Sequence, residues 1–317
     1  MLVGRWSARH DWRMPITTSR TEQERGGQGV LYVVATPIGN PADITERALE
    51  VLGGADIVAC EDTRRAGLLL ASHGIKKPLV SYYEHNEEKR IPELIGRLRA
   101  GAKIALVTDA GTPAISDPGF RLVRAAHRAG IRVVAVPGAS AMLAALSVAG
   151  IPTDRFTFEG FLPTRESARR HALEALRAET RTMVFFEAAR RLAETLATMA
   201  EVLGAGRQAA VVREATKTHE ETIRATLGEL AGIFASREAL GEVTIVVEGV
   251  PAKAAASEPT ERSAVTIALL LESGLSLKQA SAVVAKLTGR SRREVYNEAV
   301  KAGQGGEREP GDADSEH

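Results

Sequence analysis

Short apolar runs alternate with amphipathic stretches along the first half of this 317-residue chain, and this pattern constrains the fold more than any other feature. The runs are rich in Val, Ile and Ala, and the segments between them have the spacing of one-sided helices. They are Val30–Ala35, Ala55–Cys60, Leu79–Tyr82, Lys103–Val107 and Arg132–Val136. Strands that alternate with helices favour βαβ units, so the sequence predicts a mostly parallel, buried sheet.

A second series of β-rich runs begins after a break at Ala149–Pro152. Helical patterns separate most of these runs, and the approach to Ile223 has the pattern of an antiparallel hairpin arm. The runs are Arg155–Phe161, Thr182–Phe186, Gln208–Arg213, Glu220–Ala225 and Glu242–Glu248, and the helical stretches are Arg165–Arg177, Arg190–Leu203 and Leu227–Ser236. The sequence therefore predicts an α/β fold with two α/β domains.

Composition predicts the remaining domain limits. Residues 1–29 are rich in Arg, Ser and Gly and are expected to form a flexible extension, in which Met14 is a second candidate start. The N-terminal α/β domain should span residues 30–150, and the C-terminal α/β domain residues 151–249. A linker of small residues at 250–260, a small helical domain at 261–302 and a disordered acidic tail at 303–317 are expected to follow.

The small helical domain contains three short helix patterns, Ser263–Glu272, Leu277–Thr288 and Arg292–Lys301. Its basic residues are Arg262, Lys278, Lys286, Arg290, Arg292, Arg293 and Lys301, and its acidic residues are Glu261, Glu272, Glu294 and Glu298. Seven basic against four acidic residues leave a net charge of plus three. This charge suits a solvated helical face and, as an alternative, a module that contacts nucleic acid.

Composition disfavours several functional classes. The chain has 41 Lys and Arg against 40 Asp and Glu, so any nucleic-acid surface must come from local clustering. The single cysteine, Cys60, excludes an internal disulfide framework and fits a buried strand position in a protein of the reducing cytoplasm.

The chain contains no apolar span of 18 residues, so the sequence predicts no membrane helix. No i, i+4 histidine pair occurs, and Ala35–Asp43 lacks the dinucleotide and Walker glycine patterns, so we expect no metal and no ordinary dehydrogenase or NTPase.

The segment Val107–Gly119 connects the fourth run to the next helix pattern. Two Gly, two Pro and two Asp crowd this connection, which imposes more constraint than a solvent loop needs. In open α/β sheets, ligands collect outside the carboxyl ends of the strands, where backbone N–H groups converge. We interpret the segment as a binding loop, with a well-packed structural turn as the alternative.

Five ordered motifs carry a resemblance to a known family. They are ATPIGNPADITERALEVL (Ala35–Leu52), ACEDTRR (Ala59–Arg65), VTDAGTPAISDPG (Val107–Gly119), VPGASAMLAALSVAG (Val136–Gly150) and REATKTHEE (Arg213–Glu221). From about Val30 to Lys301, the chain resembles the ribosomal RNA small subunit methyltransferase I family, within the tetrapyrrole methylase superfamily.

This resemblance implies a fold of the tetrapyrrole methylase type, in which S-adenosylmethionine binds in a cleft between the two α/β domains. It further implies a cytoplasmic homodimer that acts on 16S rRNA in the 30S ribosomal subunit. The implied reaction is 2'-O-methylation of cytidine 1402 in the decoding region. Neither a membrane nor a metal is implied as a partner.

By the same resemblance, the cofactor would contact loops that follow strands of both domains. The implied positions are Pro37, Ile38, Asp109, Gly111, Thr112, Ile115, Ser140 and Ala141 in the first domain, and Phe186, Glu187, Ala215 and Val243 in the second. Tetrapyrrole relatives carry Asp where this chain has Thr112. Whether Thr112 makes the ribose contact of that Asp is therefore open, and Asp109 is the alternative residue for this contact. Ser140 also fits a plain helix N-cap.

Charged side chains after two strands are candidates for the catalytic side of the site. They are Glu61 and Arg64 after the second run, and Glu214 and Lys217 after the third run of the second domain. Opposed acid and base suit an RNA hydroxyl, whereas helix capping by Asp62 or Thr63 and a solvated loop at Lys217 are the alternatives. Orientation of the hydroxyl can contribute about 7 to 11 kcal/mol, against roughly 3 to 5 for a general base, so no single proton acceptor is expected to be essential.

Two further segments bear on nucleic-acid binding. The aromatics of Tyr82–Glu87 are candidates for stacking a flipped base, with a surface turn as the alternative. The basic stretch of Arg165, Arg169, Arg170 and Arg177 suits a large polyanion. Two other functions stay open, namely a methylase of corrin or sirohaem precursors and a non-catalytic RNA-binding protein of ribosome assembly.

Overall fold

The computed structural model describes residues 29–237, 239–251, 266–288 and 291–301. These residues divide into two units. The first contains residues 29–144 together with Thr216–Thr218, and the second contains Ala145–Ala215 and the described residues from His219 onward. The predicted N-terminal extension, linker and acidic tail lie almost entirely outside the described residues, and the domain limits stay predictions.

The first unit is built on a parallel sheet. Its strands are β1 (Val30–Val34), β2 (Ile57–Cys60), β3 (Leu79–Ser81), β4 (Lys103–Leu106) and β5 (Arg132–Val136). They lie in the order β3-β2-β4-β1-β5, and every neighbouring pair is parallel, which confirms the predicted sheet. Because β1 and β4 are adjacent yet connect onward in opposite directions, their carboxyl ends form a topological switch point, where open α/β sheets bind ligands.

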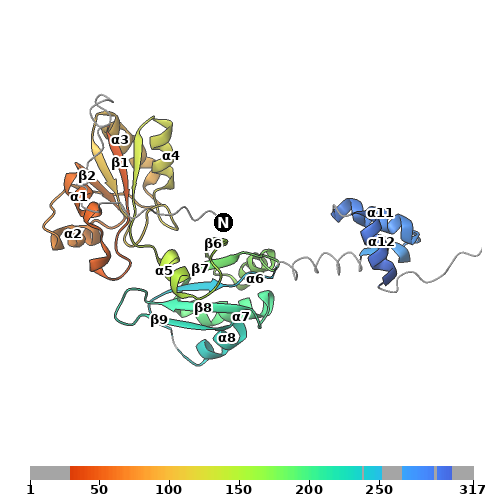
Figure 1. The fold of residues 1–317 in the computed structure, drawn as a ribbon. Helices are drawn as coiled ribbons and strands as arrows, with labels where there is room; N and C mark the ends of the chain where they lie inside the picture. Colours follow the sequence, from red (N-terminus) through yellow and green to blue (C-terminus); the bar gives the residue numbers. More distant parts are fainter. Residues whose placement is uncertain (1–28, 238, 252–265, 289–290, 302–317) are drawn as a thin grey trace, which may run out of the picture. The chain divides into compact units, whose positions relative to one another are not determined.

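Helices cover both faces of this sheet (Figure 1). They are α1 (Glu46–Gly54), α2 (Thr63–Ser72), α3 (Glu87–Arg99) and α4 (Phe120–Arg128). Residues of α1 and α2 are buried with Val34 and Val58 on one face, whereas residues of α3 and α4 are buried with Leu31 and Ile104 on the other. The strands are apolar toward both faces because helices on both sides exclude water from them.

The second unit contains a mixed sheet. Its strands are β6 (Phe156–Phe161), β7 (Thr182–Ala188), β8 (Gln208–Arg213), β9 (Glu221–Thr226) and β10 (Glu242–Val247). Their order is β6-β7-β10-β8-β9, and only β6 and β7 run parallel. The antiparallel hairpin predicted for the approach to Ile223 is the β8–β9 pair.

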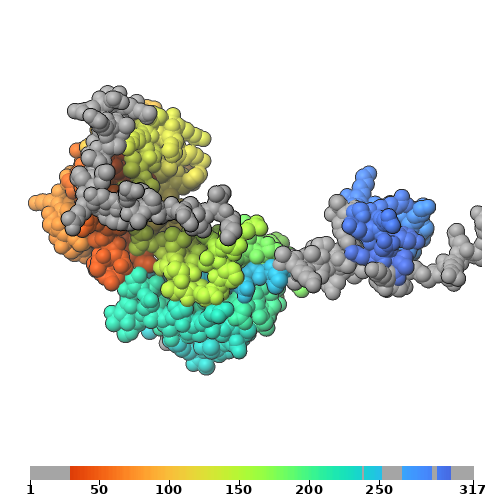
Figure 2. Space-filling model, viewed as in Figure 1, coloured from red at the N-terminus to blue at the C-terminus, as the bar shows by residue number. Residues whose placement is uncertain are grey.

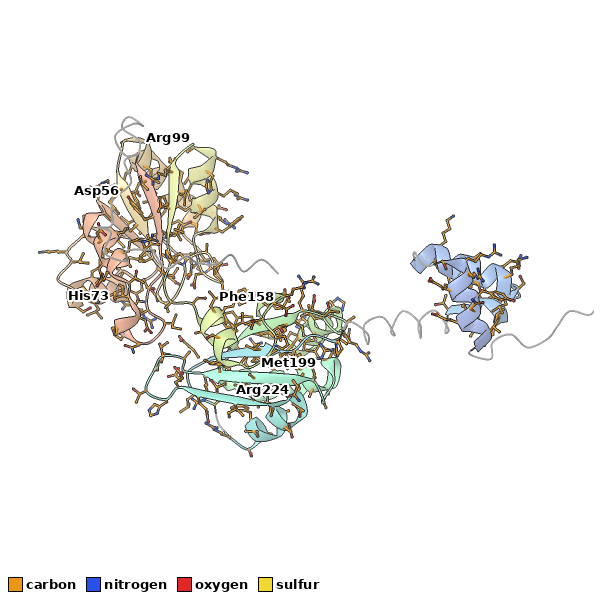
Figure 3. The ribbon with its side chains drawn as sticks, in the orientation of Figure 1. Asp56, His73, Arg99, Phe158, Met199 and Arg224 are labelled. Atoms are coloured by element: carbon orange, nitrogen blue, oxygen red, sulfur yellow. The ribbon has the colours of Figure 1, made fainter. Side chains whose placement is uncertain are left out.

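Helices also pack on the second sheet. They are α6 (Glu166–Ala175), α7 (Leu192–Leu203), which follows the short 3-10 turn Ala189–Arg191, and α8 (Leu227–Ala235). Met199 of α7, labelled in Figure 3, is fully buried in one cluster with Phe185 of β7 and Ile245 of β10. The helix α5 (Ala141–Val148) follows β5, and the limit between the two units falls within it.

The C-terminal helical region includes residues 266–272, α11 (Leu277–Thr288) and α12 (Arg292–Lys301). Ile267, Val284 and Val295 share its small core, and α11 and α12 form one compact body, shown in blue in Figure 2. Ser291 and Glu294 cap the start of α12 reciprocally through their side chains and backbone N–H groups. Helices are thus confirmed at the predicted places, as far as these residues are described. Within the described part of the chain, no helix has the length and apolar character needed to cross a membrane.

Candidate functional site

Hydrogen bonds join the loops that follow three neighbouring strands of the first unit, β4, β1 and β5. The N–H of Thr36 donates to the Gly111 carbonyl at 2.8 Å, and the N–H of Gly111 donates back to the Thr36 carbonyl at 3.1 Å. The Thr36 hydroxyl donates to the Thr108 carbonyl at 3.1 Å, and the Thr112 hydroxyl to the Ala139 carbonyl at 3.3 Å. These hydrogen bonds therefore join the segment Val107–Gly119, which follows β4, to the loops that follow β1 and β5.

The backbone of this segment is strained at several positions. Gly111 has φ +80°, a conformation that favours glycine, and a Cβ there would only be in van der Waals contact with Ile38 Cγ2, at 3.4 Å. Ala114 and Ser116 also have positive φ, at +70° and +60°, which is unfavourable for residues with a Cβ. Non-glycine residues in this conformation persist only where the surroundings enforce it, and they concentrate at functional sites.

The implied cofactor positions of the first unit line these joined loops with small or apolar groups. Ile38 and Gly111 are buried, Pro37, Thr112, Ser140 and Ala141 are half-buried, and Ile115 is exposed. Ser140 precedes α5, and the N–H of Leu143 lies 3.5 Å from its hydroxyl oxygen, so the N-cap alternative has some support. The surface that these residues form offers hydroxyls, backbone groups and small apolar side chains.

Asp109 links this cluster of loops to the start of α2. Its Oδ1 accepts a hydrogen bond from the N–H of Asp62 at 3.1 Å, and its Oδ2 lies 3.3 Å from the Arg65 guanidinium. Both oxygens are engaged within the first unit, which reduces what Asp109 can offer a ribose in place of Thr112.

Asp62 caps α2, as the capping alternative predicted. Its Oδ1 accepts a hydrogen bond from the backbone N–H of Arg64 at 2.8 Å, and its Oδ2 pairs with the Arg64 guanidinium at 2.9 Å. Hydrogen bonds from Arg64 lower the pKa of Asp62 to about 2. The Arg64 side chain is 88% exposed, so most of its surface remains accessible to a phosphate.

Two carboxyl groups near these loops have raised pKa values. Burial, followed by the charge of Asp109, raises the pKa of Glu61. Burial, followed by the charge of Glu61, raises the pKa of Asp117 to about 6. With a pKa of about 6, Asp117 exchanges its proton close to neutral pH, as a general base does. Asp117 is the second Asp of the glycine- and proline-rich segment and is not among the predicted site residues.

Cys60 is a buried residue at the end of β2, as predicted. Burial, then the charges of Asp109 and Asp62, raise the pKa of its thiol to about 11, so the thiol stays protonated and unreactive. Among the described residues, no group of three or more His, Cys, Asp or Glu is placed to hold a metal ion.

The prediction that Tyr82 is available to stack a base is wrong. Its side chain is only 1% exposed, and its hydroxyl donates to Glu87 Oε1 at 2.8 Å. The same Glu87 oxygen accepts a hydrogen bond from the N–H of Gly119 at 3.1 Å, so this carboxylate holds the end of the binding segment. Tyr83 is 41% exposed and makes an edge contact with His85, and it is the aromatic residue of this stretch that solvent reaches.

In the second unit, the implied cofactor positions lie at the ends of β7, β8 and β10. Phe186 packs edge-on against Phe158, labelled in Figure 3, with ring centroids 4.9 Å apart. Glu187 is buried, and its Oε2 accepts a hydrogen bond from the Thr195 hydroxyl at 2.6 Å and pairs with Arg191 at 3.3 Å. Val243 is buried beside it, in register on β10. Any ligand contact of Glu187 would therefore use its backbone.

The loop between β8 and β9 is strained and well anchored. Glu214 has φ +51°, and its Oε1 accepts a hydrogen bond from the N–H of Glu242 at 3.0 Å. Thr216 has φ +67°, and its hydroxyl oxygen accepts a hydrogen bond from the N–H of Asn40 at 3.1 Å. Ala215, between them, is half-buried.

Lys217 packs against the loop that follows β1. A Cβ on Gly39 would lie 2.4 Å from Lys217 Cγ, which explains the glycine at this position. Lys217 thus lies in the first unit, whereas Glu214 lies in the second, and the solvated-loop alternative does not describe Lys217.

The basic stretch on α6 is not uniformly available to a polyanion. Arg169 is 3% exposed, its Nε donates to the Thr198 hydroxyl at 3.2 Å, and its guanidinium pairs with Glu194 at 3.7 Å. The prediction is therefore wrong for Arg169, which is a core residue between α6 and α7. Arg170 pairs with Glu201.

Comparisons with known proteins agree with this architecture. The family model for tetrapyrrole (corrin/porphyrin) methylases matches residues 30–231, and the model for the RsmI C-terminal HTH domain matches residues 258–303. A ribosomal RNA small subunit methyltransferase I from Escherichia coli O157:H7 is 46% identical over 276 residues, which cover 86% of this chain and 96% of that protein. The chain belongs to the ribosomal RNA small subunit methyltransferase I family.

Another member of this family, from Mesorhizobium japonicum, is 48% identical over 272 residues, covering 86% of this chain and 91% of its own length. A crystal structure of diphthine synthase covers 70% of this chain and 90% of its own, with a TM-score of 0.55 and 18% sequence identity. At this identity the likeness concerns the fold alone. The predicted resemblance and the fold of the tetrapyrrole methylase type are confirmed, and the chain is of a methyltransferase family.

Proposed function

We propose that this protein transfers a methyl group from S-adenosylmethionine to the 2'-hydroxyl of a cytidine in the decoding region of 16S rRNA, cytidine 1402 by resemblance. The observation that carries the proposal is the joining of three strand-end loops at the switch point of the first sheet, in a chain of this family. We further propose that the substrate is the 30S ribosomal subunit in the cytoplasm.

The residues at these loops fit S-adenosylmethionine. The cofactor presents an adenine, a ribose diol, a methionine zwitterion and a sulfonium cation, which need backbone donors and acceptors among small side chains. Pro37, Ile38, Gly111, Ser140 and Ala141 provide such a surface. In the second unit Phe186, Glu187, Ala215 and Val243 are the proposed positions, with Glu187 acting through its backbone.

Thr112 is proposed to accept a hydrogen bond from the ribose. Its hydroxyl proton is directed to the Ala139 carbonyl, so the oxygen keeps acceptor capacity for a second partner. An acceptor is also what the carboxylate of an Asp would provide at this position. The Thr112 hydroxyl therefore replaces that carboxylate in function, without support from Asp109.

When bound, the cofactor supplies an electrophilic methyl carbon, and the protein must orient the RNA hydroxyl toward it. Orientation is worth more than proton removal, about 7 to 11 against roughly 3 to 5 kcal/mol. Arg64, largely exposed, is proposed to hold a phosphate, and Lys217 to contribute a second positive charge beside Gly39. Glu61 and Asp117 are the carboxyl groups best suited to receive the hydroxyl proton, while Glu214 maintains the β8–β9 loop.

We also propose that the protein is a homodimer. Phe156 and Phe161, 38% and 57% exposed, lie on β6, which is an edge strand of the second sheet, and an exposed edge strand can pair with another chain. Sedimentation of wild-type protein and of Phe161→Glu tests this, since the substitution should shift the dimer toward monomer. A wild-type monomer at all concentrations would contradict the proposal.

The decisive experiment supplies radiolabelled S-adenosylmethionine and 30S subunits from a strain that lacks the gene. The expected result is one labelled cytidine whose 3' linkage resists alkali, because methylation removes the 2'-hydroxyl that attacks the phosphate. Label on a base, or on another nucleotide, would overturn the proposed position of transfer. Label in a tetrapyrrole precursor but not in 30S subunits would favour a tetrapyrrole methylase, and failure to bind the cofactor would favour a non-catalytic assembly protein.

A further inference from the structure

The exposed side of α12 separates its residue types. Arg293, Tyr296, Asn297 and Val300 are exposed, whereas Val295 and Ala299 are buried. At about 100° of rotation per residue, the four exposed residues fall within one sector of roughly 100°. Glu294 and Glu298 lie beyond this sector, on the flank next to Asn297. One face of α12 thus presents a cation, an aromatic ring and an amide without a carboxylate among them.

The groups on this face are not used within the helical region. Among the described residues, none pairs with the Arg293 guanidinium or hydrogen-bonds the side chains of Tyr296 and Asn297. Arg292 behaves differently, since its guanidinium donates to the Lys278 carbonyl of α11 at 3.3 Å. Tyr296 is 40% exposed although an aromatic side chain gains most by burial. The arrangement leaves three recognition groups free for a partner.

The place of α12 in the fold points to the class of partner. It is the second of two consecutive helices in a region that matches a helix-turn-helix model, and in that motif the second helix contacts the nucleic acid. In that motif the first residues of the second helix contact the nucleic acid, and Arg293 and Tyr296 lie at the corresponding end of α12. Arginine pairs with phosphate, and an aromatic ring stacks on an unpaired base.

We propose that the face of α12 formed by Arg293, Tyr296, Asn297 and Val300 is an RNA-binding surface that docks the protein on small-subunit rRNA. This inference rests on the proposed function for the identity of the RNA. Arg293 contacts a phosphate, and Tyr296 stacks on an unstacked base of a single-stranded segment. The surface delivers the substrate, and the strand-end loops of the first unit perform the chemistry.

Binding of the full chain to 16S rRNA, and to 30S subunits, tests the proposal across a salt series. Arg293→Glu should weaken binding and reduce the slope of log affinity against log salt by about 1, the signature of one lost phosphate contact. Tyr296→Ala should weaken binding roughly 5- to 100-fold with little change of slope, as expected for loss of base stacking. Cofactor affinity should not change in either variant.

Lys286→Glu is the matched control, because Lys286 is an exposed cation of α11 and its replacement changes the charge equally. Equal weakening by Lys286→Glu and Arg293→Glu would overturn the proposal in favour of diffuse attraction. Unchanged RNA affinity in Arg293→Glu and Tyr296→Ala, with methyl transfer intact, would overturn it and leave the proposed function standing. If the wild-type protein binds the rRNA through this face but transfers no methyl group, the proposed function is wrong and the RNA-binding surface still stands. Tyr296→Phe should retain wild-type affinity, which separates loss of the ring from a folding defect.

Discussion

The carboxylate of Glu87 holds the backbone of Gly119, whose N–H donates to Glu87 Oε1 at 3.1 Å. Glu87 stands at the start of α3, and Gly119 closes the binding segment that follows β4. Tyr82 and Arg121 also bind this carboxylate, at 2.8 Å and 3.4 Å. The strained segment is therefore fixed at one end by Thr36 and at the other by Glu87.

Glu87→Ala should destabilise the protein by about 2 to 5 kcal/mol, because it leaves a buried N–H and a buried hydroxyl without partners. Urea unfolding measures this change. Tyr82→Phe is the control and should lower the free energy of unfolding by only about 1 kcal/mol, since the hydrogen bond from the Gly119 N–H to Glu87 remains. Cofactor affinity should fall in Glu87→Ala and hold in Tyr82→Phe. Equal stability losses in both variants would show that Gly119 does not depend on Glu87.

Gly111→Ala should weaken cofactor binding more than it weakens the fold. Its φ of +80° costs a residue with a Cβ about 1 to 2 kcal/mol, and the added carbon would lie 3.4 Å from Ile38 Cγ2, within the proposed cofactor surface. Gly74→Ala is a matched control, with φ +69° and no atom within 4 Å of the added carbon. Calorimetric titration should detect a loss of affinity in the first variant alone, and similar affinities would place the cofactor elsewhere.

Thr112→Val should weaken S-adenosylmethionine binding roughly 5- to 100-fold, because the isosteric side chain neither donates to Ala139 nor accepts from a ribose. Thr112→Ser keeps the hydroxyl and should bind nearly as well as wild type. Equilibrium dialysis with labelled cofactor distinguishes the two. A valine variant that binds as tightly as the serine variant would rule out the ribose contact.

Asp117→Asn should change how stability depends on pH. The pKa of Asp117 is raised from 3.8 to about 6 in the folded protein, so between these values the folded state holds a proton that the unfolded state has released. Wild-type stability therefore falls as pH rises through this window, and Asp117→Asn removes that fall. The carboxyl is partly exposed, so the gain of the variant relative to wild type between pH 4 and pH 7 should be about 1 to 2 kcal/mol. Chemical denaturation at both pH values measures it, and a constant difference would contradict the raised pKa.

Glu61→Gln and Lys217→Met should each slow methyl transfer by less than about 100-fold, because orientation outweighs proton removal. Single-turnover rates at saturating cofactor and RNA measure the chemical step. Complete loss of turnover in either variant, with both affinities intact, would show that one proton acceptor or one charge is essential.

Periodicity and turn chemistry predicted most of the architecture. The strands β1 to β10 and the main helices lie within a few residues of the predicted limits, and Val107–Gly119 connects β4 to α4 as expected. These features depend on local spacing of apolar residues and on glycine and proline, which a linear pattern contains.

Burial of polar side chains was not predictable in the same way. Tyr82 and Arg169 are of residue types common on surfaces that bind RNA, yet both side chains are buried. Tyr82 is hydrogen-bonded to Glu87 and Arg169 to Thr198, so neither is available to RNA. The pKa of Asp117 is raised by burial and then by the charge of Glu61, which is 56 positions away in sequence. Such environments arise from contacts between elements, and no short pattern encodes them.

By itself, the sequence determined two α/β domains, a helical C-terminal region and membership of a methyltransferase family, because periodic burial and long ordered motifs are properties of the chain read in order. Only the tertiary structure decided which groups of the candidate site meet. It joined Thr36 to Gly111, directed the Thr112 hydroxyl to Ala139 and placed Lys217 beside Gly39. The physical reason is that strand order, and not chain order, brings the loops after β4, β1 and β5 together, and strand order follows from packing of the whole sheet.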